Sequence, residues 1–185
     1  MITRPLEPGT WDAFAGLVEA NNGVWGGCWC MAFHPEGLER DPGALRAHKL
    51  RRVQSGDAHA ALVFDGEDCL GWCQFGSPAE LPRVPNRKAY EAGPGEPPDW
   101  RITCFFSGRG ARGRGVAATA LSGALEQIAA LGGGVVEGYP EDAAGRKVSG
   151  SFLFHGTLAM FESQGFERVR KIGKHRWVVA KAVGP

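Results

Sequence analysis

The most constraining segment of the chain is a loop of glycine and arginine between two regular elements. Residues 107–117 contain four glycines and three arginines but no acid. The preceding run, 101–106, predicts a strand, and 116–131 carries apolar side chains at helical spacing. Another strand is expected over 134–139, so this stretch predicts a strand–helix–strand crossover whose strands run parallel. The predicted apolar face of the helix comprises Leu121, Leu125, Ile128 and Leu131.

Apolar spacing and turn residues divide the rest of the chain into further elements. Residues 76–100 hold six prolines and predict a loop-rich insert. The predicted class is mixed α/β or α+β, with one sheet that is antiparallel in its first part. The expected bounds are 11–20 and 42–54 for two opening helices, 59–64 and 70–75 for a hairpin, 158–164 for a short helix capped by Thr157, and 166–172 and 176–181 for two closing strands.

The composition indicates one globular domain covering residues 1–185. The chain has 43% hydrophobic and 22% charged residues, and its formal net charge is +1. Such a charge balance gives no global attraction for nucleic acid or an anionic membrane. The first twelve residues are interrupted by charges, which argues against a signal peptide, and no apolar run reaches the roughly 18 residues of a membrane span. The odd count of five cysteines argues against a disulfide framework, so we expect a reduced, cytoplasmic protein.

The glycine-arginine loop is a candidate anion site. It precedes a helix N-terminus, where backbone N–H groups are free, and glycine allows close approach to them. With Arg112 and Arg114 it predicts a pyrophosphate site. A solvated basic loop is the alternative interpretation. The spacing Gly108-x-Gly110-x-x-Gly113 also satisfies a dinucleotide fingerprint, although the doubly wound architecture around that fingerprint is not evident here.

A third pattern fits the same loop. Arg112-x-x-Gly115-x-Ala117, placed between a strand and a helix, resembles the acyl-CoA motif of the Gcn5-related N-acetyltransferase (GNAT) superfamily. The order of elements and the ending Glu162-x-x-Gly165-Phe166 extend the resemblance over essentially the whole chain. It implies a mixed sheet with an antiparallel N-terminal part, splayed parallel central strands and flanking helices.

The resemblance also implies acetyl-CoA as cofactor and direct transfer of its acetyl group to a small-molecule amine. Backbone groups of Phe105, Phe106 and Ser107 would meet the pantetheine arm and the acetyl carbonyl. Backbone N–H groups of residues 112–117 would hold the pyrophosphate. The implied cofactor-binding set is Phe105, Phe106, Ser107, Arg112, Gly113, Arg114, Gly115, Val116, Ala117 and Thr157.

The chain departs from this pattern where many GNAT proteins carry a tyrosine that protonates the leaving thiolate. Phe161 stands there and has no proton to donate. Glu137 and Tyr139 are two residues apart on one predicted strand, hence on one face, and are the candidate base and acid. His155 and Cys104 are further ionisable candidates, with capping and burial as their ordinary interpretations.

Aromatic residues between the first two helices are candidates for the acceptor pocket. Trp25, Cys28 and Trp29 would suit an apolar or cationic amine, and core packing is the alternative. A zinc site is not expected, since Cys69 and Cys73 would lie roughly 13 Å apart on a strand.

The basic cluster near the C-terminus is expected to be a solvated strand face. There Arg168 and Arg170 would point outward and Val169 inward. We expect no nucleic-acid or membrane partner, and a homodimer stays open as the assembly. Two other functions remain as alternatives: a non-catalytic acyl-CoA-binding module and a dinucleotide-dependent oxidoreductase.

Overall fold

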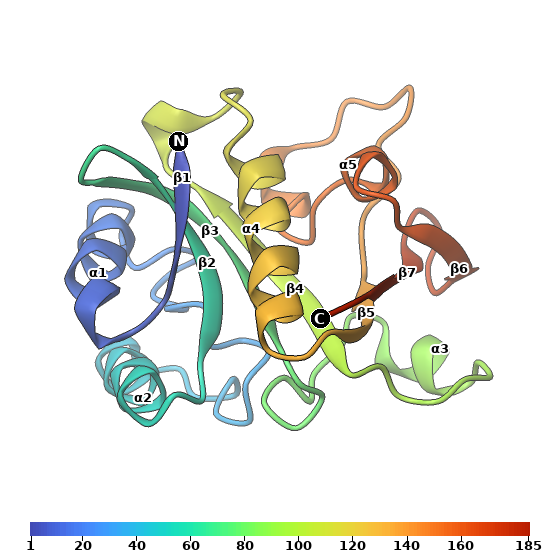
Figure 1. Cartoon of the computed structure of the whole chain (residues 1–185), viewed down its shortest axis with the longest axis horizontal. Helices are drawn as coiled ribbons and strands as arrows, with labels where there is room; N and C mark the ends of the chain where they lie inside the picture. The colour runs from blue at the N-terminus through green and yellow to red at the C-terminus, as the bar shows by residue number, and fades with distance from the viewer.

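The computed structural model describes the backbone of residues 1–185 and every side chain except that of Ser151. Its centre is a seven-stranded sheet with the order β1-β2-β3-β4-β5-β7-β6 (Figure 1). Over this described backbone, β4 and β5 pair in parallel and the other neighbours pair antiparallel. The predicted fold class is therefore confirmed. The strands are β1 (Ile2–Pro5), β2 (His59–Asp65), β3 (Asp68–Gly76), β4 (Trp100–Ser107), β5 (Gly134–Gly138), β6 (Glu167–Lys171) and β7 (Trp177–Val183).

The parallel pair at the centre of the sheet is short. Its Cα pairing begins at Trp100–Val136 and ends at Ile102–Gly138. Beyond that point β5 stops, whereas β4 continues to Ser107. The C-terminal half of β4 is thus left without β5 as a neighbour, and its backbone groups need other partners.

A bulge in β4 decides which face of the sheet its side chains cover. The pairing register with β3 shifts beside Thr103. Ile102 and Phe105 consequently share one core, while Cys104 and Phe106 belong to the other. Strict alternation along a strand would have placed Ile102 with Cys104.

Helices cover the two faces of the sheet separately (Figure 1). The long helix α4 (Val116–Ala130) packs on one face through Ala120, Leu121 and Ile128, which are fully buried. The helices α1 (Trp11–Ala20) and α2 (Pro42–Ser55) pack on the other face, where Phe14 and Trp72 form part of an aromatic core. The predicted bounds of all three helices agree with the structure to within a residue.

Side-chain caps define two of the helix starts. The Asp41 carboxylate accepts a hydrogen bond from the Ala44 N–H at 2.8 Å, at the beginning of α2. The Thr157 hydroxyl accepts one from the Met160 N–H at 3.3 Å and opens α5 (Leu158–Ser163), as predicted. In each case the side-chain oxygen satisfies an N–H that the first turn leaves without a partner.

Four local expectations were wrong or incomplete. The proline-rich insert contains a short helix, α3 (Arg87–Glu91), and the first residues form β1, which pairs with β2. Leu131 is 52% exposed because α4 ends before it, and Val169 is 53% exposed because a bulge in β6 turns it outward. Three 3-10 turns complete the chain: η1 (Pro8–Thr10), η2 (Arg109–Ala111) and η3 (Gly150–Phe152).

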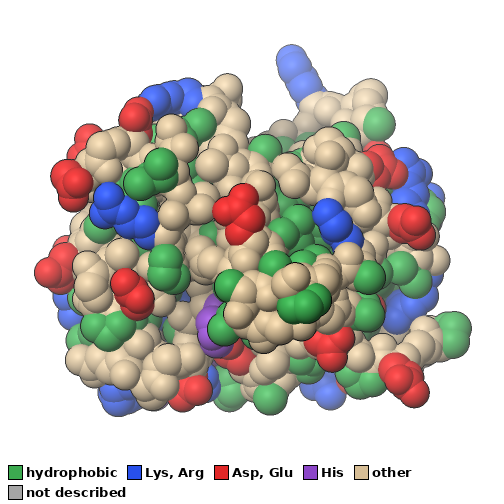
Figure 2. Space-filling view, in the orientation of Figure 1, with side chains coloured by type: hydrophobic (Ala, Val, Ile, Leu, Met, Phe, Trp, Pro, Cys, Tyr) green, Lys and Arg blue, Asp and Glu red, His purple; other side chains and the backbone are tan. Residues whose placement is uncertain are grey.

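Charges of both signs are mixed on the surface. Basic and acidic side chains alternate over the face shown in Figure 2, consistent with the net charge of +1. No helix of the described residues is long and apolar enough to cross a membrane.

Candidate functional site

A groove of about 520 Å³ opens where β4 loses its partner β5. It lies between the C-terminal end of β4, the start of α4 and the start of α5. Figure 1 shows the orange segment between β5 and α5 beside the N-terminal end of α4. Of the predicted cofactor-binding residues, the groove is lined by Phe105, Phe106, Ser107, Arg112, Gly113, Ala117 and Thr157.

The N-terminus of α4 presents free backbone donors beside this groove. Gly115 occupies the position before the helix with φ of 80°, a left-handed conformation that favours glycine. Among the side chains that the structure describes, none caps this helix. The N–H groups of its first turn therefore have no intrahelical acceptor, and the positive end of the helix dipole adds to their attraction for an anion.

Arg112 and Arg114, the two arginines of the predicted pyrophosphate site, differ in their surroundings. Arg112 is exposed at the groove and forms no ion pair with any described side chain. Arg114 turns away and pairs with Asp65 at 2.9 Å. Val116 is 2% exposed and packs in the core, so only its backbone can serve a ligand. The candidate anion site therefore consists of backbone donors and Arg112 rather than of both arginines.

The backbone of β4 is already engaged at one point of the groove. The Phe105 N–H donates to the Phe154 carbonyl at 2.6 Å. This bond draws the segment before α5 against the unpaired half of β4. The Phe154 ring packs with Trp25 and Phe33, at centroid distances of 6.0 and 6.5 Å. The sequence did not indicate the bond between Phe105 and Phe154, because no local pattern links residues 49 positions apart.

The three predicted acceptor residues lie in different places. Trp25 is 50% exposed and lines the groove. Cys28 lines a smaller adjoining cavity of about 270 Å³, together with Trp25. Trp29 is 5% exposed and stacks on Trp11 at 6.0 Å in the core, so it has no free face for a ligand.

Phe161 is part of the core and not of the groove lining. It is fully buried, with Phe105 and Phe166 edge-on at 5.8 and 4.9 Å. Its ring also contacts Gly138, which leaves no room for a Cβ there. The residue that departs from the GNAT tyrosine is therefore packed in the hydrophobic core.

Glu137 and Tyr139 share a face, as predicted, but neither lines the groove. The Tyr139 hydroxyl donates to Glu137 Oε2 at 3.1 Å. Tyr90, from the insert, donates to the same oxygen at 2.8 Å. Burial, followed by the charge of Glu137, raises the pKa of Tyr139 far above its usual range, and burial and the Glu137 hydrogen bond raise the pKa of Tyr90. No local pattern in the sequence indicated Tyr90, because it lies more than 40 residues from Glu137 in the chain.

A buried polar cluster lies on the face of β3 and β4 that α1 and α2 cover. His34 Nε2 lies 3.1 Å from Lys49 Nζ and 2.8 Å from Gln74 Nε2. Burial lowers the pKa of Lys49, and burial together with the Lys49 charge lowers the pKa of His34. Cys104 is also buried here, and its hydrogen bond with Cys30 raises its pKa well above the usual value. A thiol held protonated is a poor nucleophile, so Cys104 is not supported in that role.

The remaining candidate residues are His155 and the cysteines. His155 is 2% exposed, and burial lowers its pKa to about 3, so it stays neutral. All five cysteines are free. Within the described residues, no three His, Cys, Asp or Glu side chains come close enough to hold a metal ion.

The structure resembles solved acetyltransferases along its whole length. It matches the "histone acetyltransferase HPA2 and related acetyltransferase" of Corynebacterium glutamicum with 16% identity and a TM-score of 0.53, covering 100% of this chain and 97% of that one. It matches the GNAT phosphinothricin acetyltransferase of Sinorhizobium meliloti, solved in complex with AcCoA, with 14% identity and a TM-score of 0.54, covering 100% and 90%. An aminoglycoside 6'-acetyltransferase type Ii gives 15% identity and a TM-score of 0.55, covering 100% and 99%. No protein-family profile and no curated protein sequence matches this chain.

These likenesses show that the chain has the GNAT fold, as the resemblance in its sequence predicted. The dinucleotide interpretation of the loop is not supported. It requires a doubly wound parallel sheet, whereas the described sheet contains one parallel pair.

Proposed function

We propose that the chain is an acetyl-CoA-dependent N-acetyltransferase that acts on a small-molecule amine. The observation that carries this proposal is the uncapped N-terminus of α4, which opens onto the groove beside the unpaired half of β4. In a GNAT fold, this is the position that the acyl-CoA motif of the sequence implies for the cofactor.

The residues of the groove fit the parts of acyl-CoA. The first-turn N–H groups of α4 and the unpaired Arg112 suit a pyrophosphate. Phe106, Ala117 and Met160 offer apolar surface for a pantetheine arm. When bound, acetyl-CoA supplies the activated thioester carbonyl that an amine attacks.

Engagement of the acyl group at Phe105 requires a local rearrangement. The Phe105 N–H is one of the backbone groups that the resemblance places along the pantetheine arm and the acetyl carbonyl, and in this structure it donates to the Phe154 carbonyl. We expect the segment that precedes α5 to release this N–H when the cofactor binds. The exposed ring of Trp25, at the same groove, is the candidate contact for the acceptor, with Cys28 in the adjoining cavity.

The groove itself offers few side chains that could transfer a proton. An ammonium has to lose a proton before it can attack, so a base is needed. The proposal keeps Glu137 as this base and Tyr139 as the acid. Because both lie outside the groove lining, an acceptor or a bridging water would have to connect them to the thioester.

A second candidate function is a non-catalytic acyl-CoA-binding module. Two observations favour it: Phe161 has no proton to donate, and no described lining residue of the groove is an acid, a histidine, a lysine or a tyrosine. For either function we propose a cytoplasmic protein whose other ligand is a small molecule rather than nucleic acid or a membrane.

An assay of thiol release distinguishes the two functions. Purified protein is mixed with acetyl-CoA and a panel of amines, including an aminoglycoside, polyamines and amino acids, and free CoA is followed with a thiol reagent. Amine-dependent release, with a product heavier by one acetyl group, is the expected result. Acetyl-CoA binding by calorimetry without release from any amine would support the binding module, and absence of binding would contradict both.

A further inference from the structure

A second cavity, of about 310 Å³, lies away from the groove. Its walls come from α3 and the loop 93–97 of the insert, and from β4, β5, β6 and β7. The side chains that matter for its chemistry are Arg101 on β4, Arg170 on β6, Glu137 on β5 and Tyr90 on α3. The acyl-transfer proposal uses only Glu137 of this set.

Arg101 is a buried cation that is only partly satisfied. It is 7% exposed, and its Nη1 donates to the Leu81 carbonyl at 2.9 Å. Its Nε is buried and has no hydrogen-bond partner among the described atoms. The bond to Leu81 anchors one end of the guanidinium, so the group is held in place with an unused donor.

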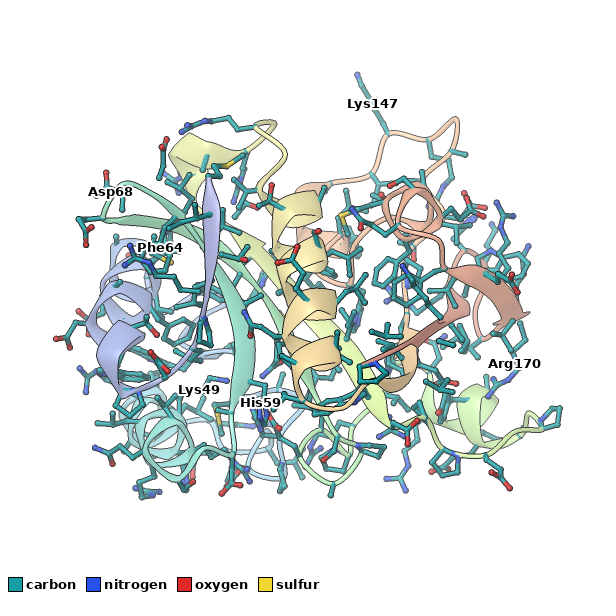
Figure 3. The ribbon with its side chains drawn as sticks, viewed as in Figure 1. Lys49, His59, Phe64, Asp68, Lys147 and Arg170 are labelled. Atoms are coloured by element: carbon teal, nitrogen blue, oxygen red, sulfur yellow. The ribbon has the colours of Figure 1, made fainter. Side chains whose placement is uncertain are left out.

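Arg170 is half-buried and is also only partly satisfied. Its Nη2 donates to the Tyr90 carbonyl at 2.9 Å, and its guanidinium lies 4.9 Å from the centre of the Tyr90 ring. Its Nη1 is buried without a described partner. Figure 3 shows Arg170 at the end of β6 that faces α3. No acidic side chain of the described chain lies within ion-pair distance of either arginine.

Both guanidiniums line the cavity, and neither has a carboxylate partner in the described chain. Buried arginines in native proteins are rarely left without a counter-charge, so an anionic group in the cavity would complete the site. The forked N–H donors of arginine match the planar oxygens of a carboxylate. Both arginines line one cavity, so a single carboxylate placed there could meet both.

The acidic residues of the cavity restrict the rest of the ligand. Glu137 faces the interior, and Glu91 and Glu96 are exposed at the rim. These carboxylates repel a polyanion such as a nucleotide but attract an ammonium group. The volume is at the lower end of ligand pockets, which run from about 300 to 1,000 Å³, so the ligand is small.

We propose that this cavity binds a small zwitterion of the amino-acid type, with its carboxylate on Arg101 and Arg170 and its ammonium group toward Glu137. Val169 and Ala180 line the same cavity and would contact an apolar part of the ligand. The inference does not depend on acyl transfer, because it concerns binding alone.

Calorimetry and thermal unfolding test this site directly, without any CoA compound. The probes are the standard L-amino acids, with propionate as carboxylate alone, ethylamine as amine alone and inorganic phosphate as a simple anion. At least one amino acid should bind and raise the Tm, with ten times the affinity of propionate and no comparable effect of ethylamine or phosphate. The proposal is overturned if no amino acid binds, or if phosphate binds as well as the best of them.

Matched variants on β6 locate the bound amino acid. Arg170→Gln should weaken its binding at least tenfold. Arg168→Gln, two residues away, is the control: Arg168 is exposed, pairs with Glu162 at 2.6 Å and does not line the cavity. Arg101→Gln should also weaken binding, and circular dichroism verifies that each variant is folded. Equal affinity for Arg170→Gln and Arg168→Gln would refute the assignment, even if Arg101→Gln fails to fold.

Discussion

The backbone N–H of Phe105 donates to the carbonyl of Phe154 at 2.6 Å, across the gap where β4 has lost β5 as a neighbour. This bond satisfies a buried donor that the end of the parallel pairing would otherwise leave free. It also occupies one of the backbone groups that the GNAT resemblance assigns to the pantetheine arm and the acetyl carbonyl. The segment before α5 and an acyl group would therefore compete for one donor.

Phe154→Ala should strengthen acetyl-CoA binding by about two- to fivefold. The Phe154 ring packs against Trp25 and Phe33, and its loss should favour the released position of the segment, which raises the binding-competent fraction. Calorimetry with acetyl-CoA measures the change. Phe152→Ala is the control, because Phe152 is 64% exposed and is not a groove residue. Unchanged or weaker binding by Phe154→Ala would argue against competition at Phe105.

Gly115→Asp should weaken CoA binding at least tenfold relative to Gly115→Asn. Asn and Asp have nearly the same shape and tolerate positive φ better than most residues, and a Cβ at Gly115 meets nothing within 4 Å. The two variants thus differ mainly in a negative charge beside the proposed pyrophosphate site. Both should lose stability to a similar extent, because each must adopt the left-handed conformation that Gly115 has at φ 80°. Equal CoA affinity of the two variants would place the pyrophosphate elsewhere.

Glu137→Gln tests the catalytic role proposed for this carboxylate. If Glu137 is the base, kcat should fall by about 10²- to 10⁴-fold and the limb of the pH–rate profile that reports its titration should disappear. The amide keeps an oxygen that can accept from Tyr90 and Tyr139, so the fold should survive. Glu126→Gln, on the exposed side of α4, is the control. A change in KM alone, with kcat and the pH profile retained, would show that Glu137 binds a ligand without taking the proton.

Phe161→Tyr should destabilise the protein by about 1–3 kcal/mol without raising activity. The new hydroxyl would enter the close packing of this ring against Phe105, Phe166 and Gly138, and a buried hydroxyl is costly without a hydrogen-bond partner. Denaturation with urea measures the loss. An undiminished free energy of unfolding together with a higher kcat would show instead that this position can supply an acid.

His59 should make stability depend on pH near neutrality. Its Nδ1 lies 2.6 Å from Glu80 Oε2, and the hydrogen bond to Glu80 raises the pKa of His59 in the folded state (Figure 3 labels His59). A raised folded pKa stabilises the protein below the unfolded value, about 6.5, and this contribution is lost as pH rises through the folded pKa. Urea denaturation at several pH values should show that loss, and His59→Gln should remove it. A His59→Gln protein with the same pH dependence as the original would exclude this pair as the cause.

Local patterns predicted much of the fold correctly. Helical spacing, the cap Thr157 and the glycine-arginine loop placed the main helices within a residue or two of their observed bounds. β1 was missed because its few residues pair only through β2, and α3 was missed because the prolines around it resemble a loop. Seven of the ten residues predicted to bind the cofactor line one groove. Most of them belong to one strand, one loop and one helix start, which are consecutive in the chain.

The sequence by itself determined most of the elements, their order and the glycine-arginine loop, because each depends on residues close together in the chain. Tertiary structure alone decided which side chains meet. It placed Trp29 in the core, turned Arg114 toward Asp65, set Phe154 against Phe105, and joined Tyr90 to Glu137. Such contacts depend on a bulge in β4, on where β5 ends and on how the insert folds back. A hydrophobic pattern specifies burial for a residue, but the identity of its neighbour is specified by the packing of the whole sheet.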